Sequence, residues 1–302
     1  MPEGATPGTP PGIPPVIGII GGSGIYEIEG LKNAEWRDVA SPFGAPSDAL
    51  LCGELDGQRL VFLPRHGRGH KLPPSAVNFR ANIDALKRVG VTEILSLSAV
   101  GSLREDLPPG TFVIVDQFID RTFAREKSFF GPGMVAHVSV ADPVCGRLGD
   151  RLEAAAGELG LPHRRAGTYM VMEGPQFSTR AESRLYRSWG CDVIGMTNMP
   201  EAKLAREAEI CYATVAMVTD YDCWHDAHDH VTVDQVVKTL FDNADKARAL
   251  VKQVVPTLSG RTEPCAKGCH HALDAALITH PEARDPAQLA RLNAVAARVL
   301  GG

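Results

Sequence analysis

An uncharged run of nine residues, ICYATVAMV at positions 210–218, constrains the fold of this chain more than any other segment. A strand that is apolar on both faces has to be covered on both, which is typical of parallel sheets in α/β proteins. Strand and helix patterns alternate along positions 16–258, and this order also predicts a mainly parallel sheet with helices on both faces. We therefore expect an α/β fold built around a buried strand at 210–218.

Two carboxylates, Asp220 and Asp222, follow this run and are separated only by Tyr221. On extended chain, side chains two residues apart point to the same face, with their Cα atoms roughly 6–7 Å apart. Burial raises the pKa of a carboxyl group, and a second carboxylate nearby raises at least one of the two further. Such a pair can offer one acceptor and one protonated donor at neutral pH, which matches the N7–N6 edge of adenine. An Asp pair that caps the next turn or binds a metal ion fits the same residues equally well.

The composition argues against several classes of protein. The 302-residue chain has a net charge of −5 and no basic run, so it is a poor candidate for binding nucleic acid or an anionic membrane. No apolar stretch approaches the roughly 18 residues of a transmembrane helix. Seven cysteines, scattered singly over most of the chain, do not form the pattern of a disulfide framework. Residues 1–15 lack the apolar segment of a secretory signal, so we expect a cytoplasmic protein.

Turn and cap residues mark the ends of several elements. Asp56-Gly57 lies between two apolar segments and predicts a tight β-hairpin. Asp142-Pro143 predicts the start of a helix that reaches Leu159. Thr179, with Glu182 three residues later, forms the capping-box pattern at the start of another helix.

The chain is predicted to hold one α/β domain, at 16–258, between two different ends. Residues 1–15 are rich in Pro and Gly and predict a flexible leader. After Ser259-Gly260 the composition shifts, and positions 272–278 and 286–300 are rich in Ala and Leu, which predicts two helices. Residues 259–302 are therefore predicted to be a C-terminal helical extension.

Three predicted strands end in residues that suit an oxyanion. Gly21-Gly22-Ser23-Gly24 lets backbone N–H groups and the Ser23 hydroxyl approach an anion closely. Arg65-His66-Gly67 supplies a guanidinium and an imidazole, and Ser98-Ala99-Val100-Gly101 supplies another hydroxyl with further backbone donors. Ligands of such sheets gather outside the carboxyl ends of the strands, so the three segments together predict a phosphate site. Taken singly, a Gly-rich turn or a surface Arg-His pair is common and predicts little.

These segments, in this order and with this spacing, closely resemble the methylthioadenosine phosphorylases, a family within the trimeric purine nucleoside phosphorylase group. The resemblance covers about residues 16–258. The motifs that carry it are Gly21-Gly22-Ser23-Gly24, Arg65-His66-Gly67, Ser98-Ala99-Val100-Gly101, Glu173-Gly174-Pro175-Gln176-Phe177, Gly195-Met196-Thr197 and Asp220-Tyr221-Asp222. Ser23 and Ser98 stand where some relatives have threonine, and both keep the hydroxyl. The resemblance implies a single-domain nucleoside phosphorylase-like fold, with a central mixed twisted sheet flanked by helices, and a homotrimer.

The same resemblance implies phosphorolysis, in which phosphate attacks C1′ of 5′-methylthioadenosine and adenine leaves, giving 5-methylthioribose 1-phosphate. 5′-Deoxyadenosine is a second candidate substrate. Phosphate is the nucleophile and a co-substrate, so we expect no cofactor. Asp220 is expected to protonate N7 of the leaving base as a general acid, while Asp222 accepts a hydrogen bond from N6. His66 is expected to lie between phosphate and sugar, in an orienting or a charge role.

The remaining residues implied by the resemblance are binding residues. The phosphate ligands are expected to be Ser23, Arg65, His66, Ser98, Ala99 and Thr197. The nucleoside contacts, besides the two aspartates, are expected to be Phe177, Ser178, Met196, Val233, Val236 and His137. Phe177 would stack on the base, although a core phenylalanine fits the bare sequence as well. Glu173 would lie near the ribose that Met196 contacts, either as a ligand of the sugar or as supporting structure.

The 5′ pocket decides which nucleoside is preferred. Val233, Val236 and Val237 give the helix after position 232 an apolar face, where hydroxyl-binding relatives are expected to have a histidine. An apolar lining favours a methylthio group by roughly 0.8 kcal/mol per buried carbon and leaves a 5′-hydroxyl unpaired. The resemblance also suggests that His137 reaches the pocket of a neighbouring subunit, and a solvated loop histidine fits the sequence nearly as well.

The tail contains Cys265, Cys269, His270 and His271, which together could hold zinc. Their spacing is not that of a standard zinc finger, however, and no second pair balances them. We therefore expect no metal ion, and a helical extension that packs over the pocket or across a subunit interface.

Three other functions compete with this interpretation. The first is phosphorolysis of 6-oxopurine nucleosides such as methylthioinosine or inosine, for which an asparagine would suit O6 better than Asp222. The second is a nucleoside-binding protein without turnover, which needs no phosphate site beside an acid. The third is a hydrolase, which needs no second anion site either. Adenine release from methylthioadenosine, with and without phosphate, separates all three.

Overall fold

The computed structural model describes residues 15–22, 24–225, 233–259 and 265–301, without the side chains of 233–238. Its strands are β1 (Val16–Gly21), β2 (Lys32–Arg37), β3 (Leu50–Leu55), β4 (Gln58–Pro64), β5 (Val91–Ser102), β6 (Phe112–Ile114), β7 (Gln117–Asp120), β8 (His163–Arg165), β9 (Thr168–Val171), β10 (Val193–Gly195) and β11 (Cys211–Tyr221). Its α-helices are α1 (Phe79–Arg88), α2 (Gly146–Glu158), α3 (Arg180–Ser188), α4 (Asn198–Glu207), α5 (Val233–Leu258), α6 (Pro286–Arg291) and α7 (Ala297–Leu300). Short 3-10 helices are η1 (Pro74–Ala76), η2 (Cys269–His271) and η3 (Pro281–Ala283).

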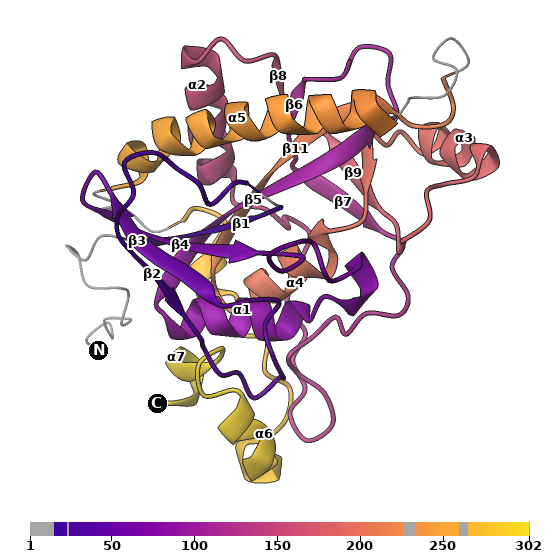
Figure 1. Cartoon of the computed structure of the whole chain (residues 1–302). Helices are drawn as coiled ribbons and strands as arrows, with labels where there is room; N and C mark the ends of the chain where they lie inside the picture. The colour runs from indigo at the N-terminus through magenta and orange to yellow at the C-terminus, as the bar shows by residue number, and fades with distance from the viewer. Residues whose placement is uncertain (1–14, 23, 226–232, 260–264, 302) are drawn as a thin grey trace.

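The strands of the described residues form one mixed sheet (Figure 1), in the order β2-β3-β4-β1-β5-β10-β9-β7. β11 pairs with both β5 and β6, and β8 continues the sheet beyond β6. β5 is central, because it runs parallel to β1 and β11 and antiparallel to β10. The α/β fold with a central mixed sheet is therefore confirmed. Antiparallel pairs such as β3–β4 and β6–β11 make the sheet less parallel than the alternation of elements predicts.

Helices cover both faces of the sheet, with α2 and α5 on one side and α1 and α4 on the other (Figure 1). The side chains of β1 point alternately to the two faces of the sheet, so this one strand contributes apolar residues to both cores. Ile17 and Ile19 pack in the core under α2 and α5, whereas Val16 and Ile20 pack in the core under α1 and α4. Because successive strand residues point to opposite faces, a strand between two layers has to be apolar throughout.

The uncharged run at 210–218 forms most of β11 and confirms the prediction of a buried strand. Every residue from Cys211 to Thr219 in this strand is buried, and burial decreases only at Asp220 and Tyr221. β11 pairs with β5 on one edge and β6 on the other, so its backbone hydrogen bonds lie inside the sheet. The polar residues that follow the run therefore emerge at the carboxyl edge of a rigid, central strand.

Local signals predicted the turns better than the helix boundaries. Leu55 pairs with Gln58 across the hairpin, where Asp56 and Gly57 have φ values of 50° and 80°, as a type I′ turn requires. The capping box at Thr179 is present as predicted. The predicted start of α2 at Asp142-Pro143 is three residues early, because Cys145 stays extended and donates its backbone N–H to Tyr212 O at 2.7 Å.

The C-terminal tail packs on the α1 side of the molecule, where α6 and α7 lie at the foot of Figure 1. Leu273 and Leu292 belong to the same core as α1 and α4. The predicted helix at 272–278 is wrong: this segment is a series of turns that ends in a bridge between Leu277 and Ala136. Hydrogen bonds to the segment 133–137, such as His137 N–H to Ala276 O at 2.9 Å, outweigh the helix propensity of its alanines.

The predicted second helix at 286–300 is divided into α6 and α7, with turns between them. Most of the leader, residues 1–14, lies outside the described residues, and the boundary at 258–259 stays a prediction. Among the helices of the described part of the chain, none combines the length and the apolar run that crossing a bilayer demands.

Candidate active site

Asp220 and Asp222 lie together over Gly101 of β5. A β-bulge between Val218 and Asp220 shifts the register, so that Asp220 stands opposite Gly101. A Cβ atom on Gly101 would lie 3.2 Å from Asp220 Oδ1 and 3.4 Å from the Cβ of Asp222. The absence of a side chain at position 101 therefore leaves the space that both carboxylates occupy.

Burial raises the pKa of both carboxyl groups above the usual range of aspartate. For Asp220, a hydrogen bond of 2.6 Å from Thr219 Oγ1 to Oδ2 opposes the effect of burial, and the charge of Asp222 adds to it. Asp222 is 9% exposed, and its Oδ2 has no hydrogen-bond partner among the described residues. A buried carboxylate oxygen without a partner is costly, so this atom marks a place where a donor from a ligand is needed.

Three hydroxyl groups meet near the carboxyl end of β5, at Ser98, three residues before Gly101. Ser98 Oγ lies 2.7 Å from Thr197 Oγ1 and 3.1 Å from the hydroxyl of Tyr169. Ser98 and Thr197 are 99 residues apart in the chain, and the structure brings them together as the phosphate prediction requires. Ala99, the next residue of β5, is exposed. These groups present polar hydrogens at a strand end, where an oxyanion can bind.

His66 is held as a neutral imidazole. Its Nδ1 lies 2.9 Å from Leu72 O, which requires the tautomer with a proton on Nδ1. The side chain is buried, and this burial, followed by the charge of Arg65, lowers its pKa to about 4. The Nε2 atom therefore keeps its lone pair at neutral pH and is an acceptor rather than a cation.

Arg65 is fully engaged with the protein interior. Its Nε and Nη2 donate to Glu201 at 2.8 and 3.1 Å, and its Nη1 donates to Leu97 O at 3.0 Å. Burial opposes the charge of this guanidinium, and Glu201 more than offsets burial, so the pKa of Arg65 is raised and the group stays charged. Since Glu201 neutralises it at close range, a direct contact between Arg65 and phosphate remains a prediction.

The predicted ribose and base residues line the next part of the site. Met196 Sδ packs so closely on Gly174 that a Cβ there would lie 2.5 Å away. Phe177 is 84% exposed, so the alternative of a core phenylalanine is wrong. Ser178 lies beside the aspartates, because its carbonyl oxygen is 3.3 Å from the Sγ of Cys223, the residue after Asp222. The contacts of these residues with a nucleoside stay predictions.

Glu173 supports the adjoining loop. It accepts hydrogen bonds from the backbone N–H of Phe123 at 2.7 Å and of Ala124 at 3.2 Å, and it forms an ion pair with Arg125 at 3.3 Å. Ser75 Oγ donates to the same carboxylate. With this many internal partners, Glu173 fits the role of supporting structure better than that of a sugar ligand.

Several predicted residues lie beyond what the structure describes. Ser23 and the side chains of Val233, Val236 and Val237 lie outside the described residues, although the backbone of α5 from Val233 onward is placed. His137 is exposed on the segment that the tail holds in place, and its contact with a second subunit stays a prediction.

The sequence patterns missed a buried polar network beneath the site. Asn198 Nδ2 donates to Ser96 Oγ at 3.0 Å and to Thr214 Oγ1 at 2.8 Å, and Glu201 accepts from Ser96 Oγ at 2.7 Å. Tyr169 was also missed, and burial raises the pKa of its phenol, which keeps it a neutral donor. The one signal available was a pair of polar residues, Asn198 and Glu201, at the start of a helix whose other residues are largely apolar.

Comparison with known proteins agrees with this geometry. A sequence profile of the Phosphorylase superfamily matches residues 16–256. The S-methyl-5′-thioadenosine phosphorylase of Rhodospirillum rubrum is 68% identical over 95% of this chain and 98% of the relative, and that of Cereibacter sphaeroides is 61% identical over 95% and 99%. The chain belongs to the methylthioadenosine phosphorylase family.

Solved structures of this family share its fold. A methylthioadenosine phosphorylase from an antarctic soil metagenomic library superposes with a TM-score of 0.88 at 49% identity, covering 92% of this chain and 98% of the other. The methylthioadenosine phosphorylase of Schistosoma mansoni in complex with tubercidin gives a TM-score of 0.77 at 39% identity, over 84% and 95%. In this family member, two aspartates, three hydroxyl groups and a neutral histidine gather at the carboxyl edge of the central sheet.

Proposed function

We propose that this chain catalyses the phosphorolysis of 5′-methylthioadenosine to adenine and 5-methylthioribose 1-phosphate. The observation that carries the proposal is the pair formed by half-buried Asp220 and buried Asp222, of which Asp222 has a carboxylate oxygen without a partner among the described residues. The high identity to relatives named for this activity supports the same substrate.

The base site supports the departure of adenine. The ionised form of Asp222 raises the pKa of Asp220, so the two groups separate into an acceptor and an acid. Protonated Asp220 donates its proton to N7 as the bond to C1′ breaks, while Asp222 accepts from the N6 amine. A positioned acid of this kind contributes about 10²–10⁴-fold to the rate. The exposed ring of Phe177 is available to stack on the purine.

The phosphate site supports the attack on C1′. Ser98 and Gly101 lie three residues apart on β5, so their Cα atoms are about 10 Å apart, and a nucleoside with phosphate beside its ribose is long enough to reach from one position to the other. Ser98, Thr197 and the Ala99 backbone hold the phosphate beside the sugar, and Ser23 and Arg65 complete its ligands. The Nε2 of neutral His66 accepts a hydrogen bond from a phosphate or sugar hydroxyl, which orients that group. Holding both reactants in line lowers the barrier by several kcal/mol.

The assembly and the setting belong to the same proposal. We propose a homotrimer in which His137 reaches the pocket of a neighbouring subunit. An exposed aromatic ring supports this proposal: Phe123, whose backbone binds Glu173, is 83% exposed in the single chain, and a neighbouring subunit would cover it. We also propose that the protein acts in the cytoplasm, on small-molecule substrates and without a cofactor besides phosphate.

The test is adenine release from methylthioadenosine with and without inorganic phosphate. Release should require phosphate, with 5-methylthioribose 1-phosphate as the second product. Equal rates in phosphate-free buffer, with free methylthioribose as product, would instead make the protein a hydrolase. Binding of the nucleoside without turnover in either buffer would make it a binding protein.

A further inference from the structure

Four cysteines from three distant parts of the chain form one buried cluster. Cys145, Cys211, Cys265 and Cys269 are each at most 5% exposed, and their Sγ atoms all lie within 4.8 Å of one another. Cys265 Sγ is 3.5 Å from Cys145 Sγ and 3.4 Å from Cys269 Sγ. The second pair of ligands that the sequence of the tail lacks is therefore supplied by the α/β domain.

We propose that these four cysteines bind one Zn²⁺ ion as a structural site. Zinc–sulfur bonds of about 2.3 Å in a tetrahedron place the sulfur atoms about 3.8 Å apart, which is the scale of the observed cluster. A disulfide requires a sulfur–sulfur distance of about 2.05 Å, which is much shorter than either of the two separations given above. Four soft thiolate ligands exclude Mg²⁺ and Ca²⁺ and suit zinc, copper(I) or iron, and a closed tetrahedral site of four cysteines is a common form of structural zinc site.

The surroundings of the cluster favour thiolates. Cys145 is the N-cap of α2, where the helix dipole stabilises negative charge. Arg206 Nη1 donates to Cys269 Sγ at 3.2 Å, and its Nη2 donates to Lys267 O at 3.0 Å, so one guanidinium fixes both a ligand and the turn before it. Arg147, two residues after Cys145, also interacts with the charge of Cys145 and Cys211, although it is ion-paired with Glu93. Outer contacts of this kind orient metal ligands and offset the charge of a tetrathiolate site.

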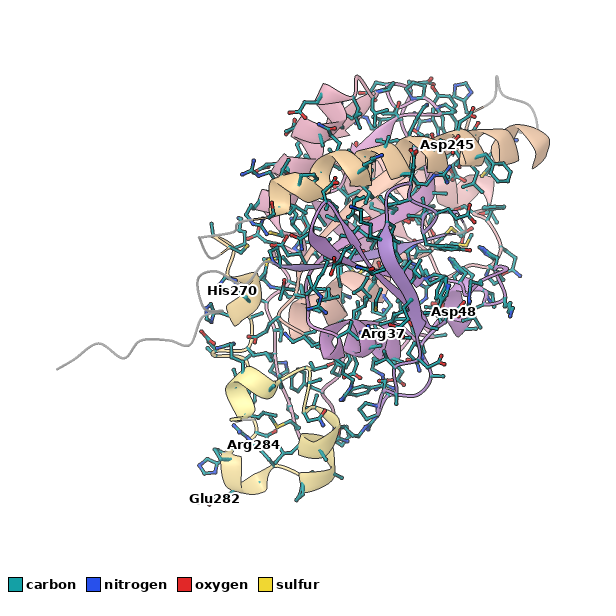
Figure 2. The ribbon with its side chains drawn as sticks, turned by 60° about the vertical axis from the view of Figure 1, so that its left-hand side comes forward. Arg37, Asp48, Asp245, His270, Glu282 and Arg284 are labelled. Atoms are coloured by element: carbon teal, nitrogen blue, oxygen red, sulfur yellow. The ribbon has the colours of Figure 1, made fainter. Side chains whose placement is uncertain are left out.

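The backbone shapes the tail half of the site. Gly268 has a φ of 60° and donates its N–H to Cys265 O at 2.8 Å, which closes a turn that brings Cys265 and Cys269 side by side. A cavity of about 510 Å³, lined by Cys265, Arg147 and Lys267 among others, gives the metal a route from solvent. In Figure 2, His270, the neighbour of Cys269, lies below α5 and above Glu282 and Arg284 of the tail.

The site holds the tail rather than taking part in the reaction. Cys211 begins β11 and Asp220 lies nine residues later, so the two sites are separated by about 30 Å along the strand. Four protein ligands leave no open position for a substrate, as in structural zinc sites. Zinc would join Cys265 and Cys269 of the tail to Cys145 of α2 and Cys211 of β11.

The decisive experiment measures the metal in the full-length protein, purified from zinc-supplemented culture without chelator. We expect one zinc ion per chain, with X-ray absorption at the zinc edge showing four sulfur neighbours at about 2.3 Å. After denaturation with a chelator and no reductant, all seven cysteines should react as free thiols. These measurements use the unaltered chain and do not depend on any variant folding.

Variants then assign the ligands. The double change Cys265→Ser and Cys269→Ser should abolish zinc binding, whereas Cys191→Ser, which alters an equally buried thiol outside the cluster, should keep it. Four results would each overturn the proposal. They are the absence of metal, a stoichiometric metal other than zinc, nitrogen or oxygen ligands at the zinc, and a loss of two free thiols for each disulfide formed. Zinc retained by the double variant would overturn it too.

Discussion

Replacing Asp222 by asparagine should turn the base site toward 6-oxopurines. The substitution keeps the shape of the side chain and replaces a carboxylate oxygen by an NH₂ donor. Adenine presents a donor at N6, which an ionised Asp222 accepts, whereas a 6-oxopurine presents the acceptor O6. The same change should therefore weaken one substrate and strengthen the other.

The size of the effect follows from the environment of Asp222. Its Oδ2 is buried and has no partner within hydrogen-bond distance among the described residues, and the nearby Ser183 hydroxyl and Cys223 N–H only partly oppose the effect of burial on its pKa. A hydrogen bond to a charged group contributes about 1.5–3 kcal/mol, which corresponds to a loss in kcat/KM of about 10- to 150-fold for methylthioadenosine. A new neutral hydrogen bond to O6, which contributes about 0.5–1.5 kcal/mol, should raise kcat/KM for methylthioinosine by about 2- to 10-fold. The ratio of the two kcat/KM values should therefore change by about 20- to 1500-fold.

The assay compares kcat/KM for methylthioadenosine and methylthioinosine. Thermal unfolding of the same variant shows whether a change in kcat/KM comes from altered base recognition or from a less stable protein. Because the folded state raises the pKa of Asp222, its contribution to stability is lost as the pH rises from the unfolded pKa through the folded one, and the ionised carboxylate carries this full cost above both. The asparagine variant should therefore unfold at the same or a higher temperature at pH 7. Asp150→Asn, whose side chain is 72% exposed, is the matched control and should change neither quantity. An equal loss with both nucleosides, together with a lower Tm, would refute base recognition by Asp222.

Three further predictions follow from the site and its surroundings. Asp220→Asn should lower kcat for adenine release by about 10²–10⁴-fold, and an unchanged rate would place the acid elsewhere. Val233→His should raise kcat/KM for adenosine relative to methylthioadenosine, and an unchanged ratio would remove the valines from the 5′ pocket. Burial raises the pKa of Glu207 to about 7, so the unfolding free energy should fall by up to about 3 kcal/mol as pH rises from about 4.5 through 7. Urea titrations across this range should show the slope, and Glu207→Gln should remove it.

The sequence predicted best what depends on neighbours in the chain. The hairpin at Asp56-Gly57 and the aspartates after β11 follow from turn chemistry and strand alternation, which need no knowledge of distant residues. Patterns alone could not show that Ser98 meets Thr197, and the family resemblance supplied that expectation. In the same way, the fold class followed from the order of elements, whereas the antiparallel pairs within the sheet did not.

The helix prediction that failed, and the contacts that the sequence did not show, all involve distant segments. The alanines at 272–278 favour a helix locally, but hydrogen bonds to the segment 133–137 hold them in turns. Arg65 resembles a free phosphate ligand until Glu201, 136 residues later, is placed against it. Cys145 and Cys211 show no spacing that links them to the tail. Each of these contacts is stabilised by burial in the folded core, which no local pattern records.

The course of β11 suggests how base preference can change during evolution while the fold persists. The strand is a stiff stem, buried and paired on both edges, that ends in a short polar tip. A mutation in the stem disturbs the packing of one core or the other, whereas a mutation at the tip affects mainly the proposed base site. Substitutions at Asp220 and Asp222 can therefore change which purine binds with little loss of stability. The tip can vary between relatives while the sequence of the stem stays the same.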